Sequence, residues 1–396
     1  MLNNKSKTEK ENDMKKFRVG VIGVGFIGVV HIEQLRRLGN VEVVALSNMV
    51  DAKLKAEELF VPKGYDDYRA MIDNENLDAI HVCTPNNTHY EMAMYAMERG
   101  VHVVCEKPMT TTVEEADALV KKAKEMNVVH AMNFNCRFYP MAYQIKEMIK
   151  NNDCGNIYTI HGGYLQDWLF YDTDYNWRLE PEAAGESRAF ADIGSHWIDL
   201  VEFVTGLSVV EVFADAVTFH KTRKKPKVDI ATYSGMALTP EDYEEVTINT
   251  EDYINVLFKM NNGARASCTI SQVFAGRKNQ MLINIAGSKC SVAWDSEDSN
   301  ELWIGRREKD NGVLVKDPSI LPDATKQNIS YPGGHVEGFP DTFKNNFRKI
   351  YQAIANKSMK DVEFATFDAG AREMLLCEKI IQSSKEGRWV KVDENV

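Results

Sequence analysis

FRVGVIGVGFIGVVHIEQLRRLGNVEVVAL, residues 17–46, decides the fold expected for this chain. It begins with an apolar run that ends in glycines, continues with apolar residues at helical spacing, and closes with a second apolar run at 41–46. Short apolar runs of this kind predict buried strands, and the spacing between them predicts a helix. The stretch is therefore expected to form a βαβ unit.

Gly23, Gly25 and Gly28 fit the pattern G-x-G-x-x-G between that first strand and the helix. Such glycines permit a tight turn, close approach of a pyrophosphate to the backbone and close helix packing, while the helix N-terminus attracts the anion. The context predicts a dinucleotide site rather than a merely structural glycine turn.

The end of the second strand bears on the choice of cofactor, because an acid there would bind the ribose of NAD and repel the 2′-phosphate of NADP. Ser47 and Asn48 are both neutral, while Asp51 would oppose a phosphate and Lys53 would attract one. The sequence leaves NAD and NADP open, with a slight preference for NAD.

The alternation of strands and helices continues to about residue 136, which predicts a parallel, doubly wound sheet. We expect residues 1–14 to be a disordered tail and residues 15–136 to be a Rossmann NAD(P)-binding domain.

After residue 136 the pattern changes. One or two helices, including DIGSHWIDLVEFVTG at 192–206, precede successive β-like runs with turns such as Asn261-Asn262-Gly263. These predict a large, mostly antiparallel open sheet. The expected fold class is thus α/β, with a C-terminal α+β domain at 137–396 for substrate binding and oligomerisation. We expect a final helix at about 365–385, and one arrangement open to it is packing against the Rossmann domain.

Composition narrows the function. The net charge of −11 argues against nucleic-acid binding, and no run of eighteen apolar residues suggests a membrane span. The first thirteen residues lack the apolar stretch of a secretion signal, so a cytoplasmic location is expected. Seven cysteines without a CxxC pair indicate neither a disulfide framework nor a metal site. The basic run KTRKKPK, residues 221–227, is typical of a solvated loop.

Asp192, His196 and Lys107 are candidate catalytic residues. Asp192 and His196 lie four residues apart, which places them on one helical face. An imidazole, with a pKa of about 6.5, suits removal of a hydroxyl proton. The alternative is that His196 is a satisfied core histidine and Asp192 an N-cap. Lys107 follows the fourth parallel strand, where ligands bind in doubly wound sheets; a solvent-facing turn lysine is the alternative.

GVIGVGFIG, TPNNTH, CEKP and ADIGSHWIDLVEFVTG occur here in an order and spacing that resemble the glucose-fructose oxidoreductase, inositol dehydrogenase and rhizopine-catabolism family, Gfo/Idh/MocA. The resemblance spans nearly the whole chain. It implies a Rossmann domain followed by an α/β domain whose open sheet often forms the subunit contact. It also implies that Lys107, Asp192 and His196 are the catalytic residues.

The segment YLQDWLFYDTDYNWRLEP, residues 164–181, has a composition suited to stacking on sugar faces, although it could equally cover the core. The expected substrate-binding residues are Lys107, Arg137, Trp168, Tyr175, Trp177, Arg178, Asp192, His196 and His335. The expected cofactor-binding residues are Gly23, Gly25, Phe26, Ile27, Gly28, Ser47, Asn48, Thr84, Pro85, Asn86, His89, Glu106, Lys107 and Asn135.

Taken together, the sequence predicts an NAD(P)-dependent oxidoreductase acting on a secondary hydroxyl of a sugar, glycoside or cyclic polyol. It would be a homo-oligomer, a dimer or tetramer formed through the C-terminal sheet. A non-catalytic sensor of sugar or cofactor on the same fold is the main alternative, and reduction of an imine or tetrapyrrole is a third.

Overall fold

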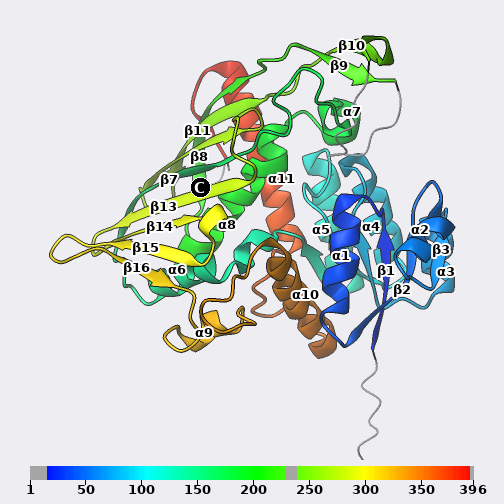
Figure 1. Ribbon diagram of the computed structural model, residues 1–396, viewed down its shortest axis with the longest axis horizontal. Coiled ribbons are helices and arrows are strands. Elements are labelled where there is room, and N and C mark those ends of the chain that lie inside the picture. The colour runs from blue at the N-terminus through cyan, green and yellow to red at the C-terminus, as the bar shows by residue number, and fades with distance from the viewer. Residues whose placement is uncertain (1–15, 228–238, 393–396) are drawn as a thin grey trace, which may run out of the picture.

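The computed structural model describes residues 16–227 and 239–392, so the expected tail at 1–14 lies outside the described residues. Figure 1 shows two sheets with helices between and around them. No helix in the described ranges is both long and apolar enough to cross a membrane.

The first sheet is the expected Rossmann sheet. Its six strands are all parallel and follow the order β3-β2-β1-β4-β5-β6. The strands are β1 (Phe17–Ile22), β2 (Val41–Ser47), β3 (Lys63–Tyr65), β4 (Ala79–Val82), β5 (His102–Cys105) and β6 (His130–Met132). The helices between them are α1 (Phe26–Arg36), α2 (Ala52–Glu58), α3 (Tyr68–Asn74), α4 (His89–Met97) and α5 (Val113–Met126). The strand order reverses between β1 and β4, and ligands of such sheets bind at that point.

The second sheet has nine strands in the order β16-β15-β14-β13-β7-β12-β11-β8-β17. They are β7 (Ile157–Leu165), β8 (Val209–Val217), β11 (Tyr253–Met260), β12 (Arg265–Ser271), β13 (Gln280–Gly287), β14 (Ser291–Asp295), β15 (Glu301–Gly305), β16 (Gly312–Val315) and β17 (Val390–Lys391). Only β7 and β12 pair in parallel, which confirms the prediction of a mostly antiparallel sheet. A separate pair, β9 (Thr222–Pro226) and β10 (Tyr243–Thr247), lies beside it.

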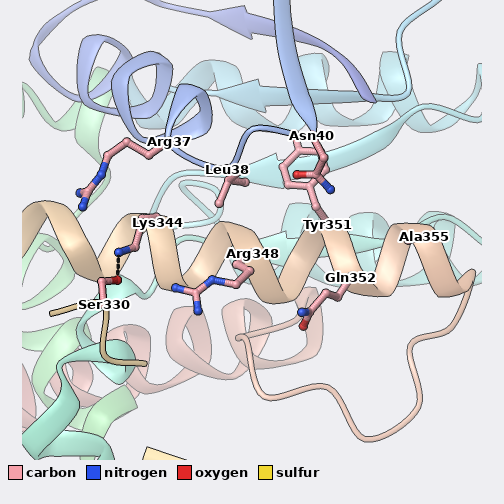
Figure 2. Close-up of a pocket in the computed structure, with 9 residues that line it drawn as sticks. All are labelled: Arg37, Leu38, Asn40, Ser330, Lys344, Arg348, Tyr351, Gln352 and Ala355. Atoms are coloured by element: carbon pink, nitrogen blue, oxygen red, sulfur yellow. Dashed lines mark hydrogen bonds between the residues drawn. The ribbon is translucent and has the colours of Figure 1, made fainter. Parts of the chain in front are cut away.

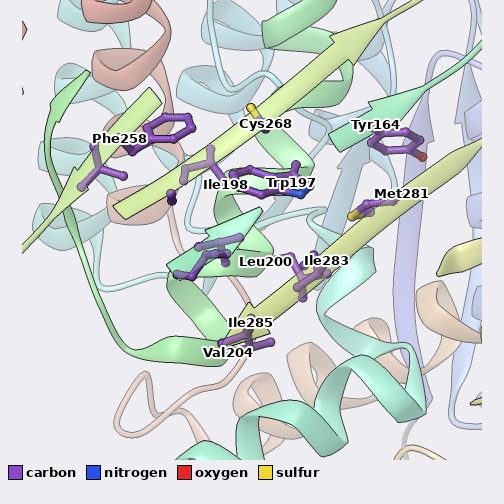
Figure 3. Packing of buried hydrophobic residues seen from close by; sticks show 14 of the residues in the cluster. Tyr164, Trp197, Ile198, Leu200, Val204, Phe258, Cys268, Met281, Ile283 and Ile285 are labelled. Carbon is purple, nitrogen blue, oxygen red and sulfur yellow. The ribbon is translucent and has the colours of Figure 1, made fainter. Parts of the chain in front are cut away.

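One face of the large sheet packs on three helices, α6 (Pro140–Lys150), α8 (Ser195–Thr205) and α11 (Phe367–Glu386). Figure 3 shows this core, in which Trp197 of α8 stacks on Phe258 of β11. The indole Nε1 of Trp197 also donates to the carbonyl oxygen of Leu282 at 2.8 Å. These contacts fix α8, the helix that carries His196, against the sheet.

The prediction of one or two helices between residue 136 and the final helix was wrong. The structure adds α7 (Pro181–Ala184), α9 (Asp323–Lys326) and the long α10 (Phe339–Asn356). α10 packs against α1 and α11 packs against α5, so the end of the chain covers both faces of the Rossmann sheet. α10 escaped prediction because polar residues share its buried face with the aromatic ones; Asn345 and Asn346 are 1% and 0% exposed.

Candidate active site

The glycine turn between β1 and α1 fits a dinucleotide. Gly23 has a φ of +82°, which favours glycine. A Cβ on Gly28 would lie 1.9 Å from the carbonyl oxygen of Gly23, so α1 approaches the turn too closely for any side chain there. A Cβ on Gly25 would meet no atom within 4 Å, which leaves open space before the N-terminus of α1. A pyrophosphate could occupy that space.

Further expected cofactor residues lie at the same edge of the sheet, after the carboxyl ends of their strands. The end of β2 is hydrogen-bonded to the glycine turn. The backbone oxygen of Ser47 accepts from the N–H of Gly23 at 2.8 Å, and the side-chain oxygen of Asn48 accepts from the N–H of Val24 at 3.4 Å. Phe26 is 61% exposed at the start of α1, beside the half-buried Ile27.

Other expected cofactor residues have protein partners. The side chain of Asn86 donates to the carbonyl of Ala184 at 2.9 Å. Asn135 donates to the hydroxyl of Thr342 in α10 at 2.6 Å. These two hydrogen bonds hold neighbouring segments together at this edge of the sheet. That Asn86 and Asn135 bind the cofactor stays a prediction.

His89 and its neighbours brace the turn after β4. The ring of His89 lies between the carbonyl oxygens of Thr84 and Pro108, at 2.8 and 2.9 Å. The hydroxyl of Thr84 accepts from Thr88 at 2.7 Å, and Pro85 precedes the short helix η1 (Asn86–Thr88).

Lys107 and Asp192 meet across the two halves of the chain. Lys107 follows β5, and its peptide bond to Pro108 is cis. Its Nζ donates to the backbone oxygen of Asp192 at 2.8 Å and to the carboxylate Oδ1 at 2.9 Å. An ammonium has three N–H groups, so one remains for a ligand.

Two more side chains converge on Asp192. Nε of Arg178 donates to Oδ1 at 3.1 Å, and Nε2 of Gln272 donates to Oδ2 at 2.9 Å. Burial alone would raise the pKa of the Asp192 carboxyl, but the charges of Lys107 and Arg178 outweigh it and hold that pKa well below its usual range. Asp192 is therefore a carboxylate at neutral pH.

The backbone that presents Asp192 differs from the expected one. Residues Phe190–Gly194 form a π-helical turn, η4, directly before α8, so Asp192 is neither an N-cap nor part of a regular α-helix. A Cβ on Gly194 would lie 2.5 Å from the Phe190 ring, which requires glycine there. Such turns occur frequently at functional sites.

His196 stands one turn further along, 8% exposed, with its ring edge against Phe134 at 5.6 Å between centroids. Its Nδ1 is buried and has no hydrogen-bond partner among the described residues. Burial first, and then the charge of Lys107, lower the pKa of His196 to about 3. The imidazole is therefore neutral, with an unshared lone pair.

Gln272 was not predicted from the sequence. It directly follows β12, is 0% exposed, and its Oε1 has no partner within the described ranges. Only the pairing of β12 beside β7 brings it to Asp192, eighty positions away along the chain. A single polar residue after a strand gives no signal strong enough to find it.

Arg137, an expected substrate-binding residue, is bound by other residues of the protein. Its Nε and Nη2 bind both carboxylate oxygens of Asp199, at 2.8 and 2.5 Å, and its guanidinium lies over Phe203. Such a bidentate pair leaves little capacity for a substrate. Arg137 instead ties η2 (Asn135–Phe138) to α8.

The aromatic segment divides in two. Trp168 and Tyr175 pack on a small core of Leu169, Leu179 and Ile248, as in the alternative of a covering loop. At the other end, the guanidinium of Arg178 lies 4.5 Å from the ring centroid of Trp177 while it binds Asp192. The Trp177–Arg178 end thus reaches Asp192, and Tyr164 at the start of the segment lies 6.3 Å from His196 between ring centroids.

His335 lies elsewhere. His335 lies in the loop before α10, and its ring is exposed. Nζ of Lys316 donates to the backbone carbonyl oxygen of His335 at 2.7 Å. That loop leads to Asp341, which pairs with Arg37 at 2.8 Å, just past the last residue of α1. The glycine turn is at the opposite end of α1, so we remove His335 from the candidate site.

A chain of buried hydrogen bonds extends from Glu106, the residue before Lys107. Glu106 Oε1 contacts His31 Nε2 at 2.9 Å, His31 Nδ1 contacts His81 Nδ1 at 2.8 Å, and His81 Nε2 contacts the Tyr351 hydroxyl at 3.0 Å. Burial raises the pKa of Glu106, but the bond from His31 and neighbouring charges reverse this and lower it to about 2. His31 thus contacts Glu106 directly beside Lys107, and His81 connects it to Tyr351.

Comparison with known proteins identifies the family. Residues 17–134 match the model of the oxidoreductase family with an NAD-binding Rossmann fold, and residues 143–293 match the GFO/IDH/MocA C-terminal domain. The chain belongs to the GFO/IDH/MocA oxidoreductase family. This confirms the resemblance found in the sequence and the expectation of an NAD-binding Rossmann domain.

Family members align over nearly the whole chain. Levoglucosan dehydrogenase of Pseudarthrobacter phenanthrenivorans is 28% identical, over 96% of this chain and 99% of its own. The crystal structure of an oxidoreductase domain protein from Kribbella flavida superposes with a TM-score of 0.86 at 28% identity, covering 96% and 100% of the two chains. Levoglucosan dehydrogenase in complex with NADH and levoglucosan, 24% identical, shares the fold with a TM-score of 0.85 over 96% of this chain and all of its own.

Proposed function

We propose that this family member transfers a hydride between a nicotinamide cofactor and a secondary hydroxyl of a neutral sugar, glycoside or cyclic polyol. The observation that carries the proposal is a pair of unpartnered buried polar atoms, His196 Nδ1 and Gln272 Oε1, beside the Lys107–Asp192 pair. Unpaired buried polar groups are costly unless a ligand pairs with them, and a hydroxyl group both donates and accepts. The relative named as levoglucosan dehydrogenase supports a carbohydrate substrate.

A bound nicotinamide cofactor would supply the hydride acceptor for the carbon that carries the hydroxyl. A nitrogen of the neutral His196 ring takes the hydroxyl proton as general base. The remaining N–H of Lys107 donates to the same oxygen and stabilises its developing negative charge. Asp192 holds the ammonium in place through two hydrogen bonds, of 2.8 and 2.9 Å, and Arg178 and Gln272 hold Asp192.

The cofactor is proposed to be NAD in preference to NADP. Neither Ser47 nor Asn48 supplies a positive charge for a 2′-phosphate, and the side chain of Asn48 already donates to the carbonyl of Val50 at 2.7 Å. A homo-oligomer through the outer face of the large sheet stays a proposal too, supported by exposed Tyr158, Leu257 and Trp303. All seven cysteines are free, which supports the cytoplasm as its compartment.

The test is cofactor reduction by a panel of sugars, glycosides and inositols, with NAD⁺ and NADP⁺ in parallel. We expect turnover with at least one carbohydrate. His196→Ala should lower it roughly 10² to 10⁴-fold while NADH binding, followed by fluorescence, is retained. Tight NADH binding with no turnover across the panel would instead favour a non-catalytic sensor. Activity that survives loss of both Asp192 and His196 would favour imine or tetrapyrrole reduction.

A further inference from the structure

A cavity of about 460 Å³ lies at the amino edge of the Rossmann sheet, away from the glycine turn. Its wall comes from the segment between α1 and β2 and from one face of α10 (Figure 2). The lining residues are Arg37, Leu38, Asn40, Ser330, Lys344, Arg348, Tyr351, Gln352 and Ala355.

Of the three cationic side chains in this cavity, two share a single carboxylate and the third has none. Figure 2 shows the head groups of Arg37, Lys344 and Arg348 turned toward the same space. Asp341 binds Arg37 at 2.8 Å and lies 3.6 Å from Lys344. The nearby Glu337 is already paired with Lys316 at 2.7 Å.

The partners of Arg348 and Lys344 are mostly neutral. Arg348 donates to the carbonyl of Gln327 at 2.7 Å and to the side-chain oxygen of Asn345, and no described carboxylate forms an ion pair with it. Lys344, whose side chain is 8% exposed, donates to the hydroxyl of Ser330. Burial and the charge of Arg37 lower the pKa of the Lys344 ammonium, as expected where cations outnumber anions.

We propose that this cavity binds a small molecule carrying a phosphate group. Two guanidinium groups and an ammonium form the donor set that suits a phosphate dianion. The volume leaves room for an organic moiety beyond the phosphate, and the wall residues Leu38 and Tyr351 offer apolar surface to it. On a chain with a net charge of −11, such a local excess of positive charge also attracts anions selectively.

Calorimetric titration of the full chain with inorganic phosphate, and in parallel with glucose 6-phosphate and glucose, tests the proposal. Excess NAD⁺ is present throughout so that the pyrophosphate site is filled. We expect phosphate to bind at one site and glucose 6-phosphate to bind there as well. Tighter binding of glucose 6-phosphate would identify a phosphorylated metabolite, and equal binding would identify phosphate itself.

Arg348→Gln and Lys344→Gln should each weaken phosphate binding roughly tenfold, since each removes a charge-assisted hydrogen bond. Arg36→Gln is the matched control. Arg36 is the last residue of α1, close to the cavity, but its guanidinium donates to the carbonyls of Leu59 and Phe60 outside the cavity. If Lys344→Gln fails to fold, the Arg348→Gln result decides alone. Absence of phosphate binding to the wild type, or equal binding by Arg348→Gln and wild type, overturns the proposal.

Discussion

The carboxylates of Asp192 and Asp252 each hold two cations, and of these two only Asp192 belongs to the candidate active site. Asp192 binds Lys107 and Arg178, while Asp252 binds Arg188 at 2.5 Å and Arg223 at 2.8 Å. The Asp252 cluster is sealed, with all three side chains 0% exposed. In the Asp192 cluster the side chains are between 12% and 27% exposed.

The two clusters are neighbours. The backbone N–H of Asp192 donates to the carbonyl of Arg188 at 2.8 Å. The backbone N–H of Gln272 donates to the carbonyl of Asp252, while its side chain binds Asp192. A buried carboxylate between cations is therefore not itself a sign of catalysis. What distinguishes the open cluster is its partial exposure and a spare ammonium N–H. Four substitutions should separate the two roles.

The largest effect is expected at the sealed cluster. Asp252→Ala leaves two arginines buried without their carboxylate, which should cost about 3–5 kcal/mol of unfolding free energy. Chemical denaturation measures this, with Asp192→Asn as the control that should lose turnover and little stability. Equal stability of Asp252→Ala and wild type would show that the cluster is solvated.

Lys107→Met should lower turnover by roughly 10² to 10³, because it removes the donor to the developing alkoxide. Asp192 keeps Arg178 and Gln272 as partners, so the unfolding free energy should change little. The control is Lys225→Met, which removes a lysine paired with Glu180 at 2.7 Å. Turnover close to wild type in Lys107→Met would exclude its role.

Acid should destabilise the open cluster through His196. Its pKa of about 3 in the fold lies below the value near 6.5 of the unfolded chain, so the unfolded chain binds the proton first. The stability that a neutral His196 contributes is complete above pH 6.5 and is lost as the pH falls toward 3. Between pH 6 and 4, the wild type should lose about 1.4 kcal/mol per pH unit more than His196→Phe. Parallel pH profiles in denaturation experiments would contradict this.

The smallest effect is expected for Gln272→Leu, which removes one hydrogen bond to Asp192 and one acceptor for substrate. We expect kcat/KM to fall roughly fivefold to thirtyfold. Gln280 offers a matched control: it is also buried, donates to Asp295 at 2.6 Å and has an unpartnered Oε1. Gln280→Leu should leave kcat/KM unchanged, and equal losses in both variants would point to a general packing effect.

What the sequence could predict was local. The glycine turn, the parallel strands and the position of Lys107 after β5 follow from short patterns whose physical reasons lie within a few residues. For Lys107, Asp192 and His196 the residues alone left catalytic and structural roles open; the family resemblance favoured catalysis, and these roles stay proposals.

What the sequence could not predict depends on partners far apart in the chain. The basic run at 221–227 looked like a solvated loop, yet Arg223 is fully buried because Asp252, in another segment, neutralises it. Gln272 and the π-helical turn were missed for the same reason, since strand pairing and the Phe190 ring define them. The alternation that predicts a strand does not reveal which polar residue at its end meets a carboxylate.

The chain of hydrogen bonds through His31 and His81 determines where protons lie inside the fold. His31 donates from Nε2 to Glu106, so with one proton its Nδ1 must accept from His81, which in turn accepts from the Tyr351 hydroxyl. The carboxylate of Glu106, two hydrogen bonds away from His81, thereby sets the tautomer of both imidazoles and the direction in which the Tyr351 hydroxyl donates.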